Sequence, residues 1–266
     1  MKVLAVIPAR YSSTRFPGKI LAKDTGKYLI QHTYERACLA KLPEKVLIAA
    51  DDEKVVEAAK TFGAECVLTS VEHQSGTDRI AEAVADIDVE IVVNLQGDEP
   101  EIDPANVDYL AKLLIDHPDY PMATLAAEFQ TPELVADPNI VKVIVVWSVQ
   151  RGADRKKLNA KRYPLNADCG KAIYFSRSVI PYDRDKSGIG DVQHYLKHIG
   201  IYAYRKSFLL EITSLPQTPL EKIEKLEQLR AIENGYDILV GIVEHTCDGI
   251  DTPEQYAEFV RRYKKK

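Results

Sequence analysis

Short apolar runs alternate with longer amphipathic segments along the first half of the chain. The apolar runs predict strands over residues 2–8, 45–50, 66–69 and 90–95. The amphipathic segments between them predict helices over 29–39, 52–62, 77–85 and 104–117. Because these strands are apolar almost throughout, both faces of each are expected to be buried, which is typical of a parallel sheet covered by helices.

The second half of the chain is less regular. Partly alternating patterns predict strands over 122–129, 141–147, 171–175 and 199–204, and hence a mixed or antiparallel extension of the sheet. Apolar residues at helical spacing predict one helix over 219–234 and another over 253–264. No repeat and no Pro-, Gly- or Ser-rich linker interrupts the sequence, so we predict a single domain over residues 1–266.

Composition narrows the class of protein. Of the 266 residues, 45% are hydrophobic and 28% charged, as in an ordinary globular protein, and the net charge of −5 argues against a nucleic-acid partner. No apolar stretch approaches the roughly 20 residues that span a membrane, so no membrane partner is expected. The cysteines, Cys38, Cys66, Cys169 and Cys247, form no C-x-x-C pair, which indicates free thiols in a reducing compartment. With no charged leader before the first strand, the prediction is a cytoplasmic protein.

The loop after the first predicted strand concentrates positive charge. Arg10, Arg15 and Lys19 lie within ten residues, with hydroxyls and backbone N–H groups between them. The loop follows the carboxyl end of a strand, where open α/β sheets bind ligands. A triphosphate carries about four negative charges, and Lys, Arg and clustered N–H groups neutralise such a group. The alternative is a solvated surface loop. A dinucleotide site is not expected, because no G-x-G-x-x-G follows the strand.

Carboxylates occur at two places that a phosphate site would use. Asp98 follows the apolar run that ends at 95, and a strand-end carboxylate beside phosphates is a natural Mg²⁺ ligand. The alternative for Asp98 is to cap the turn before Pro100. Asp251, just before the last predicted helix, is either a second ligand or the N-cap of that helix. Glu99 and Glu101 are expected to be solvated.

Motifs spread over the whole chain resemble those of one family, the 3-deoxy-manno-octulosonate (KDO) cytidylyltransferases, or CMP-KDO synthetases. The first loop alone, with Pro8, Ala9, Arg10, Ser13, Arg15, Pro17 and Lys19, would indicate only the wider nucleotidyltransferase group. Further matching segments are residues 73–79, 94–100, 174–177, 180–184, 198–204, 227–230 and 249–254, which occur in family order. Of these, 74–79 and 198–204 together are much more specific to the family.

The resemblance implies an α/β fold of the nucleotide-diphospho-sugar transferase (GT-A-like) type, with a mixed, mainly parallel sheet flanked by helices. It also implies a homodimer, with a sugar-binding and dimerisation subregion around 171–235. The implied reaction is Mg²⁺-dependent transfer of CMP from CTP to KDO, which releases pyrophosphate and serves lipopolysaccharide biosynthesis. The alternatives are an 8-amino analogue of KDO or another acidic sugar as the acceptor, and a nucleotide-binding module without turnover.

The resemblance also assigns residues by position. The implied catalytic residues are Lys19, Arg10, Arg15 and Asp98, with Asp98 and Asp251 as the Mg²⁺ ligands. The implied substrate-binding residues are Ala9, Ser13, Gln74 and Ser75 on the nucleotide side and Gln96, Arg177, His198, Tyr202, Glu227 and Gln228 on the sugar side. Arg177 suits the sugar carboxylate because a guanidinium can bind it with two parallel hydrogen bonds, the alternative being a surface salt bridge. His198 and Tyr202 lie four apart in a predicted strand and so share a face, but each could instead be a core residue.

One segment departs from the family pattern. Residues 148–169 are polar and basic where family members usually make a much shorter turn. We expect a mobile loop there, which bears on the sugar specificity and on the dimer edge rather than on the catalytic residues.

Overall fold

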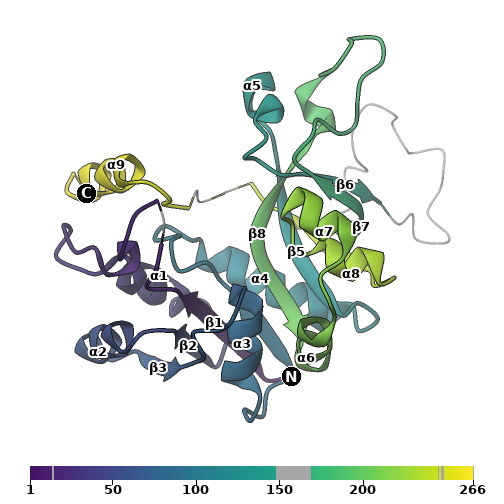
Figure 1. Cartoon of the computed structure of the whole chain (residues 1–266). Helices are drawn as coiled ribbons and strands as arrows, with labels where there is room; N and C mark the ends of the chain where they lie inside the picture. Colours follow the sequence, from purple (N-terminus) through teal and green to yellow (C-terminus); the bar gives the residue numbers. More distant parts are fainter. Residues whose placement is uncertain (14, 148–168, 245, 247–248, 266) are drawn as a thin grey trace. The chain divides into compact units, whose positions relative to one another are not determined.

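The computed structural model describes residues 1–13, 15–147, 169–244, 246 and 249–265 (Figure 1). The expected loop at 148–169 therefore lies outside the described residues, apart from Cys169. The chain divides into two compact units. The first comprises Met1–Ile115, Ile201–Thr213 and Thr246–Lys266, and the second comprises Asp116–Gly200 and Ser214–His245. The single domain over 1–266 and the subregion around 171–235 stay predictions.

Parallel strands form the centre of the first unit. They are β1 (Val3–Ala9), β2 (Lys45–Ala50), β3 (Glu65–Leu68) and β4 (Ile91–Asn94). β1 pairs in parallel with both β2 and β4, and β2 pairs in parallel with β3. The end of β8 (Leu196–Arg205) runs antiparallel to β4, with Tyr202 opposite Asn94. β1, β2 and β4 are buried at almost every position, which confirms the expectation of strands covered on both faces. The expectation is wrong for β3, which lies at the edge of the sheet with Glu65 and Leu68 exposed.

Helices connect these strands, as the amphipathic segments predict (Figure 1). They are α1 (Leu29–Ala37), α2 (Glu53–Thr61), α3 (Gly76–Val84) and α4 (Pro104–Asp116). Two begin at polar caps that satisfy free backbone N–H groups: the Asp52 carboxylate accepts from the N–H of Lys54, and the Ser75 hydroxyl accepts from that of Asp78. α6 (Lys206–Ser214) was not predicted, because it follows β8 directly, with no capping residue to mark its start.

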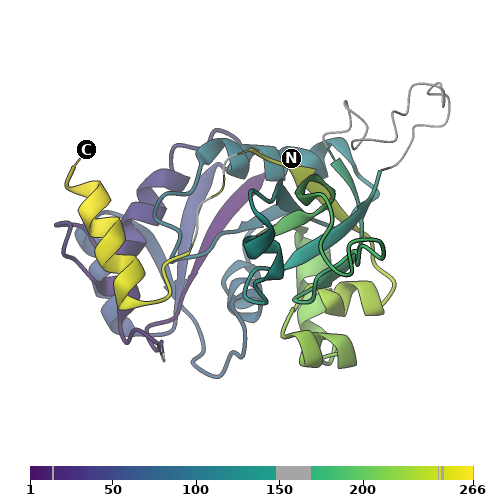
Figure 2. The ribbon, with the colours of Figure 1, turned by 90° about the horizontal axis from the view of Figure 1, so that it is seen from above.

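The last helix, α9 (Pro253–Tyr263), is held against the N-terminal part of the same unit (Figure 2). Leu29, Ile250, Tyr256 and Phe259 form a buried cluster there, and each contributes on the order of 1.5–3 kcal/mol by its burial. The Tyr256 hydroxyl accepts the N–H of Asp24 at 2.9 Å. The cluster fixes the chain just before α9, where Asp251 lies.

The second unit contains a mixed set of strands. They are β5 (Met122–Glu128), β6 (Lys142–Val146), β7 (Cys169–Ser176), the first half of β8, and β9 (Ile238–Ile242). β5 and β9 are parallel, whereas β7 is antiparallel to both β6 and β9, so the predicted mixed extension is confirmed. β9 was missed because a five-residue apolar run has no distinguishing periodicity.

Short helical segments occur in both units. η1 (Lys19–Leu21) belongs to the first unit, and α5 (Pro132–Ala136) and η3 (Val192–His194) belong to the second.

The prediction of one helix over 219–234 is wrong. The segment forms α7 (Pro219–Glu224) and α8 (Leu229–Glu233), and the break is at Lys225, whose φ of 55° is left-handed. A buried ion pair joins the two helices: the guanidinium of Arg230 donates to both carboxylate oxygens of Glu221, at 2.6 and 2.9 Å. The apolar spacing is misleading here because Ile223 of α7 is 77% exposed, whereas Leu229 of α8 is buried.

Two further expectations concern chemistry rather than topology. Cys38, Cys66 and Cys169 are free thiols, as predicted, and Cys247 lies outside the described residues. None of the helices within the described residues has the length and apolar character needed to cross a membrane.

The Glu221–Arg230 pair gives a stability prediction. Glu221→Gln keeps the side-chain volume but removes the buried carboxylate that pairs with the Arg230 guanidinium, which costs about 3–5 kcal/mol of unfolding free energy. Urea denaturation of the variant and of a Glu221→Gln/Arg230→Met double variant measures this cost. The double variant should recover part of the loss, and a single variant within about 0.5 kcal/mol of the parent would contradict the prediction, because changes of that size are typical of surface substitutions.

Candidate active site

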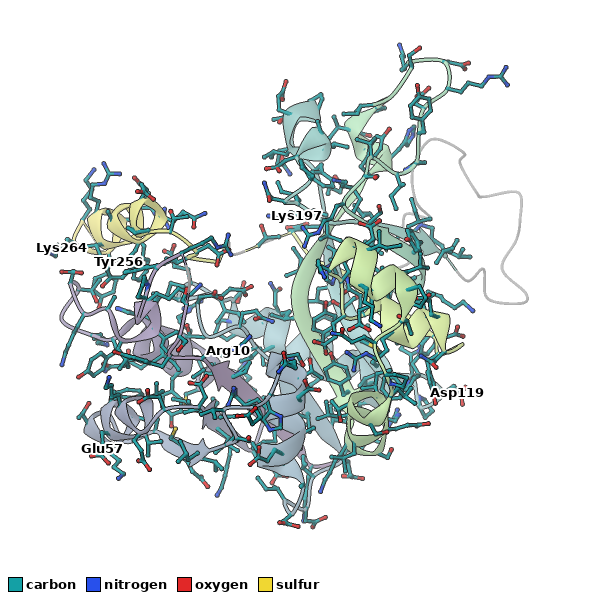
Figure 3. All side chains as sticks on the ribbon, viewed as in Figure 1. Arg10, Glu57, Asp119, Lys197, Tyr256 and Lys264 are labelled. Atoms are coloured by element: carbon teal, nitrogen blue, oxygen red, sulfur yellow. The ribbon has the colours of Figure 1, made fainter. Side chains whose placement is uncertain are left out.

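The loop after β1 is anchored at its base by Asp51. The Asp51 carboxylate accepts the N–H of Tyr11 at 2.8 Å, and its own N–H donates to the carbonyl of Ala9. Gly97, after β4, approaches the same turn so closely that a Cβ there would lie 3.0 Å from the carbonyl oxygen of Pro8. Arg10, labelled in Figure 3, follows this anchored turn. The base of the loop is therefore fixed before any ligand binds.

A polar pocket of about 450 Å³ opens over this loop in the first unit. It is lined by Pro8, Arg10, Ser12, Ser13, Arg15, Lys19, Ile20, Gly76, Gln96, Gly97 and Asp98. Six predicted site residues line it, and they come from only two segments of the chain: Arg10, Ser13, Arg15, Lys19, Gln96 and Asp98. The expected juxtaposition of the positive loop and the strand-end carboxylate at one sheet edge is thus present.

Lys19 connects the two predicted metal ligands. Its side chain is only 10% exposed, and its ammonium donates to Asp98 Oδ2 at 2.5 Å and to Asp251 Oδ1 at 3.0 Å. It also donates to the carbonyl of Ile250 at 2.7 Å. Three segments that are far apart in sequence therefore meet at one nitrogen atom.

The alternative role of Asp251 as a helix cap does not hold. The N-cap of α9 is Thr252, whose hydroxyl accepts the N–H of Gln255. The carboxylate of Asp251 instead accepts from Lys19 and, through Oδ2, from Arg15 Nη2 at 2.9 Å. Two cations and two carboxylates, those of Asp98 and Asp251, therefore balance in charge at the edge of the pocket.

The donor set fits a magnesium ion. Oxygens of Asp98 and Asp251 both lie within hydrogen-bonding distance of one ammonium nitrogen, so they converge on the position of a single cation. Within the described residues there is no group of three or more His, Cys, Asp and Glu side chains that could hold a metal by itself. Mg²⁺ at nucleotide sites commonly takes one or two carboxylates and completes its shell with phosphate oxygens and water. Asp98 and Asp251, beside the positively charged loop after β1, match this type of coordination.

The expectation that Glu99 and Glu101 are solvated is only partly right. Glu99 is buried, at 7% exposure, so the expectation is wrong for it. Glu101 is half-buried and forms an ion pair with Arg262 of α9 at 2.6 Å. The sequence pattern could not show either environment, because both depend on contacts made after the chain folds.

Arg79 is a buried residue whose role the sequence did not reveal. Its side chain is fully buried, and it donates to Thr69 Oγ1 at 2.6 Å and to the carbonyl of Ser70 at 3.1 Å. Its Nη2 lies 3.4 Å from the carboxylate of Asp51, the residue that anchors Tyr11. Burial lowers the pKa of Arg79, and the charge of Asp51 opposes that shift. Arg79 thus links the loop around residue 70 to the base of the loop after β1.

The two predicted nucleotide contacts before α3 have structural partners. The carbonyl of Gln74 accepts from Arg10 Nη1 at 3.4 Å, which brings the exposed Gln74 to the first loop. The Ser75 hydroxyl caps α3, and its N–H donates to Asp78 in a reciprocal capping box. Ser75 therefore fixes the start of the helix, whatever further contact it makes with a nucleotide.

The second unit holds most of the predicted sugar residues, and Arg177 is central among them. It follows β7, and its guanidinium donates to the carbonyl of Glu224 at 2.7 Å and to that of Pro138 at 3.1 Å. Both acceptors are backbone carbonyls rather than carboxylates, so these contacts are not a surface salt bridge. Glu227 and Gln228 lie in the turn between α7 and α8 that follows Glu224, and Gln228 is 6% exposed.

His198 lies on β8 with its ring against Phe175, at 4.9 Å between ring centroids. The Thr124 hydroxyl donates to the carbonyl of Ile199 and lies 3.0 Å from His198 Nε2. Because a hydroxyl has one proton to donate, Nε2 must carry the proton of this contact, and Nδ1 is the acceptor nitrogen. Burial lowers the pKa of His198 to about 3, so the ring is neutral near pH 7.

Gln96 and Tyr202 belong to the first unit. Gln96 lines the pocket beside Gly97, and Tyr202 lies on β8 with its ring 5.9 Å from that of Tyr204. His198 and Tyr202 are both half-buried, and the buried Ile199 and Ile201 lie between them. This alternation agrees with the prediction that the two share a face of the strand.

Comparison with known proteins identifies the family. A family model described as cytidylyltransferase matches residues 4–238. A 3-deoxy-manno-octulosonate cytidylyltransferase of Solibacter usitatus (strain Ellin6076) is 47% identical over 263 residues, covering 99% of this chain and 95% of that protein. This chain belongs to the 3-deoxy-manno-octulosonate cytidylyltransferase family. The resemblance inferred from the motifs is confirmed.

Two solved structures agree with this result, the first in family and fold and the second in fold. One, described as CMP:2-keto-3-deoxy-manno-octonic acid synthetase complexed with CTP, is 38% identical with a TM-score of 0.85, and the match covers 100% of this chain and 99% of that one. UDP-glucose pyrophosphorylase complexed with UDP-glucose is 16% identical with a TM-score of 0.65, covering 100% and 99% of the two chains. The latter likeness concerns the fold alone. Together they confirm the predicted α/β fold of the nucleotide-sugar transferase type.

The environment of His198 predicts a pH dependence of stability. In the unfolded chain this histidine titrates near 6.5, whereas in the folded protein it titrates near 3, so the unfolded state binds more protons between these values. Unfolding free energy should therefore be highest above pH 6.5 and fall as the pH drops toward 3.

The variant His198→Gln lacks this proton uptake. Between pH 6.5 and 5, the unfolding free energy of the parent should fall more steeply than that of the variant, by up to about 1.4 kcal/mol per pH unit. Urea titrations at several pH values measure both slopes. Parallel pH profiles would contradict the prediction.

Proposed function

We propose that this chain transfers CMP from CTP to 3-deoxy-manno-octulosonate, giving CMP-KDO and pyrophosphate. The observation that carries the proposal is the contact of Lys19 with both Asp98 and Asp251 at a pocket lined by Arg10, Ser13 and Arg15. Cations that suit a triphosphate and paired carboxylates that suit its metal ion occur there together. The nucleotide and the sugar are those that the names of the relatives carry.

The triphosphate would enter the pocket of the first unit. Arg10, Ser13 and Lys19 would hold its phosphates, and Arg15 would add positive charge at the rim. Attack by the anomeric hydroxyl on the α-phosphorus requires little covalent work from the protein, so placement and neutralisation of the departing pyrophosphate carry the rate. The fixed base of the loop, held by Asp51, favours such placement because the donors need little reorganisation.

Asp98 and Asp251 would hold Mg²⁺ together with phosphate oxygens. Bound there, the ion would supply polarisation of the α-phosphate and a lowered pKa of the attacking hydroxyl. Lys19 would then exchange its carboxylate partners for phosphate oxygens, which are also anionic acceptors. The ammonium therefore keeps a counter-charge at each stage, and its burial remains tolerable.

The acceptor sugar would contact the residues that the family resemblance assigns to it. Arg177 would bind the sugar carboxylate, and His198, Glu227 and Gln228 would bind hydroxyls, with Gln96 and Tyr202 as further contacts. A homodimer and a role in lipopolysaccharide biosynthesis complete the proposal, both from the family resemblance. A cytoplasmic location is proposed as well, because the cysteine pattern suits a reducing compartment.

Pyrophosphate release tests the function directly. The protein is supplied with each of the four NTPs and Mg²⁺, with and without KDO, and release is expected only with CTP plus KDO. Release with another acidic sugar, such as the 8-amino analogue, would keep the chemistry and change the substrate. No release with any sugar, from a protein that still binds CTP, would overturn the proposal in favour of a binding module.

Asp98→Asn tests the metal-binding carboxylate. The amide keeps the shape and an acceptor oxygen but removes the charge that a magnesium ion needs, so turnover should fall by about 10²–10³-fold, the scale of losing one electrostatic contact in a preorganised site. Circular dichroism and thermal melting should show a folded protein. Glu101→Gln is the matched control, since it removes a nearby carboxylate that contacts Arg262 instead. Asp98→Asn activity within a few-fold of the parent would remove Asp98 from the catalytic residues.

A further inference from the structure

Glu224, the last residue of α7, contacts Arg177 at several atoms. Its carboxylate accepts from the Ser176 hydroxyl at 2.6 Å and from the backbone N–H of Arg177 at 3.0 Å. Its backbone carbonyl accepts from Nε of the same arginine at 2.7 Å. One residue therefore fixes both the backbone and the side chain of Arg177.

Lys142, the first residue of β6, fixes the other side of the Arg177 backbone. The lysine is completely buried, and its ammonium donates to the carbonyl of Arg177 at 2.6 Å and to those of Ile140 and Asp137 at 2.8 and 3.0 Å. Burial lowers the pKa of Lys142, and the charge of Asp137 opposes this shift. The same ammonium orders the segment that contains Pro138, whose carbonyl accepts from Arg177 Nη1.

These bonds define how an anion can reach the guanidinium. Nε of Arg177 is engaged by Glu224, and one edge of Nη1 is engaged by Pro138. A carboxylate would thus approach the end of the fork formed by Nη1 and Nη2, where two parallel hydrogen bonds are still possible. A preset orientation of this kind lowers the entropy that is lost when an anion binds.

Glu224 is also continuous with the other predicted sugar contacts. The left-handed Lys225 follows it immediately, and the turn then presents Glu227 and Gln228. The buried Glu221–Arg230 pair holds the two ends of this turn together. An anchor at Glu224 therefore fixes Arg177 and the turn in one arrangement.

We propose that Glu224, supported by the buried ammonium of Lys142, is a positioning residue that presents Arg177 to the carboxylate of the acceptor sugar. The inference rests on the proposed function, because it takes an acidic sugar as the acceptor. Glu224 itself touches no reacting atom. It acts through Arg177, and the test must separate that role from a purely structural one.

Steady-state kinetics of Glu224→Ala provide the first test. The kcat/KM for the sugar should fall by about 10–100-fold, the scale of one charge-assisted hydrogen bond, while the KM for CTP stays within about twofold. Glu224→Gln keeps one acceptor oxygen, so its kcat/KM for the sugar should lie between that of Glu224→Ala and that of the parent. Glu233→Ala is the matched control, because Glu233 accepts the N–H of Leu220 on α7 but makes no bond to Arg177.

A double-mutant cycle shows whether Glu224 acts through Arg177. Arg177→Ala should lower kcat/KM for the sugar at least as much as Glu224→Ala, and the double variant should be no worse than Arg177→Ala alone. If the two losses multiply instead, Glu224 contributes independently and the proposal is wrong.

Stability measurements separate the remaining outcomes. A lowered Tm for Glu224→Ala with an unchanged kcat/KM for the sugar would make Glu224 a structural residue only and would overturn the proposal. If Lys142→Met folds, its kcat/KM for the sugar should also fall while its KM for CTP stays nearly unchanged. If it does not fold, the Glu224 variants alone test the positioning role. Failure of the proposed function would be visible separately, because the parent protein would then show no turnover with any acidic sugar.

Discussion

The ammonium of Lys19 is the contact on which the candidate site depends. It joins Asp98, at the end of a β-strand, to Ile250 and Asp251, which immediately precede the last helix. Neither segment has a local reason to lie near the other, so the packing of α9 against Leu29 must bring them together. A buried ammonium with two carboxylates and a carbonyl is stable only when all partners are in place, which couples the fold of the C-terminal helix to the chemistry of the N-terminal loop.

The first half of the fold could be predicted because local and tertiary preferences agree there. Strands buried on both faces appear as continuous apolar runs, and caps such as Asp52 mark where helices begin. The second half departs from the prediction where tertiary contacts decide. The apolar spacing around Lys225 fits one helix, yet the left-handed turn there is compensated by the buried Glu221–Arg230 pair, and no sequence periodicity contains that information.

The same distinction applies to the candidate site. Lys19 and Asp98 could be proposed because charge follows a strand end in a recognisable motif. Arg79 and Lys142 could not, since their partners include backbone carbonyls. Glu224 could not either, since its carboxylate accepts from a hydroxyl and a backbone N–H that lie 48 and 47 positions away in sequence. Carbonyl oxygens are present at every residue, so contacts with them leave no pattern of residue types. The residues that touch ligands are therefore easier to infer than the residues that hold them in place.

In each unit, a buried cationic side chain fixes a loop, and that loop carries a second, more accessible cationic side chain. In the first unit, Arg79 approaches Asp51, and Asp51 anchors the turn that presents Arg10. In the second, Lys142 holds the backbone of Arg177. Burial lowers the pKa of Arg79 and of Lys142, so each charge is maintained against an unfavourable loss of hydration. An apolar residue would avoid that cost but could not bind carbonyl oxygens. Arg10 and Arg177 would then lose the fixed orientation that recognition of an anion requires.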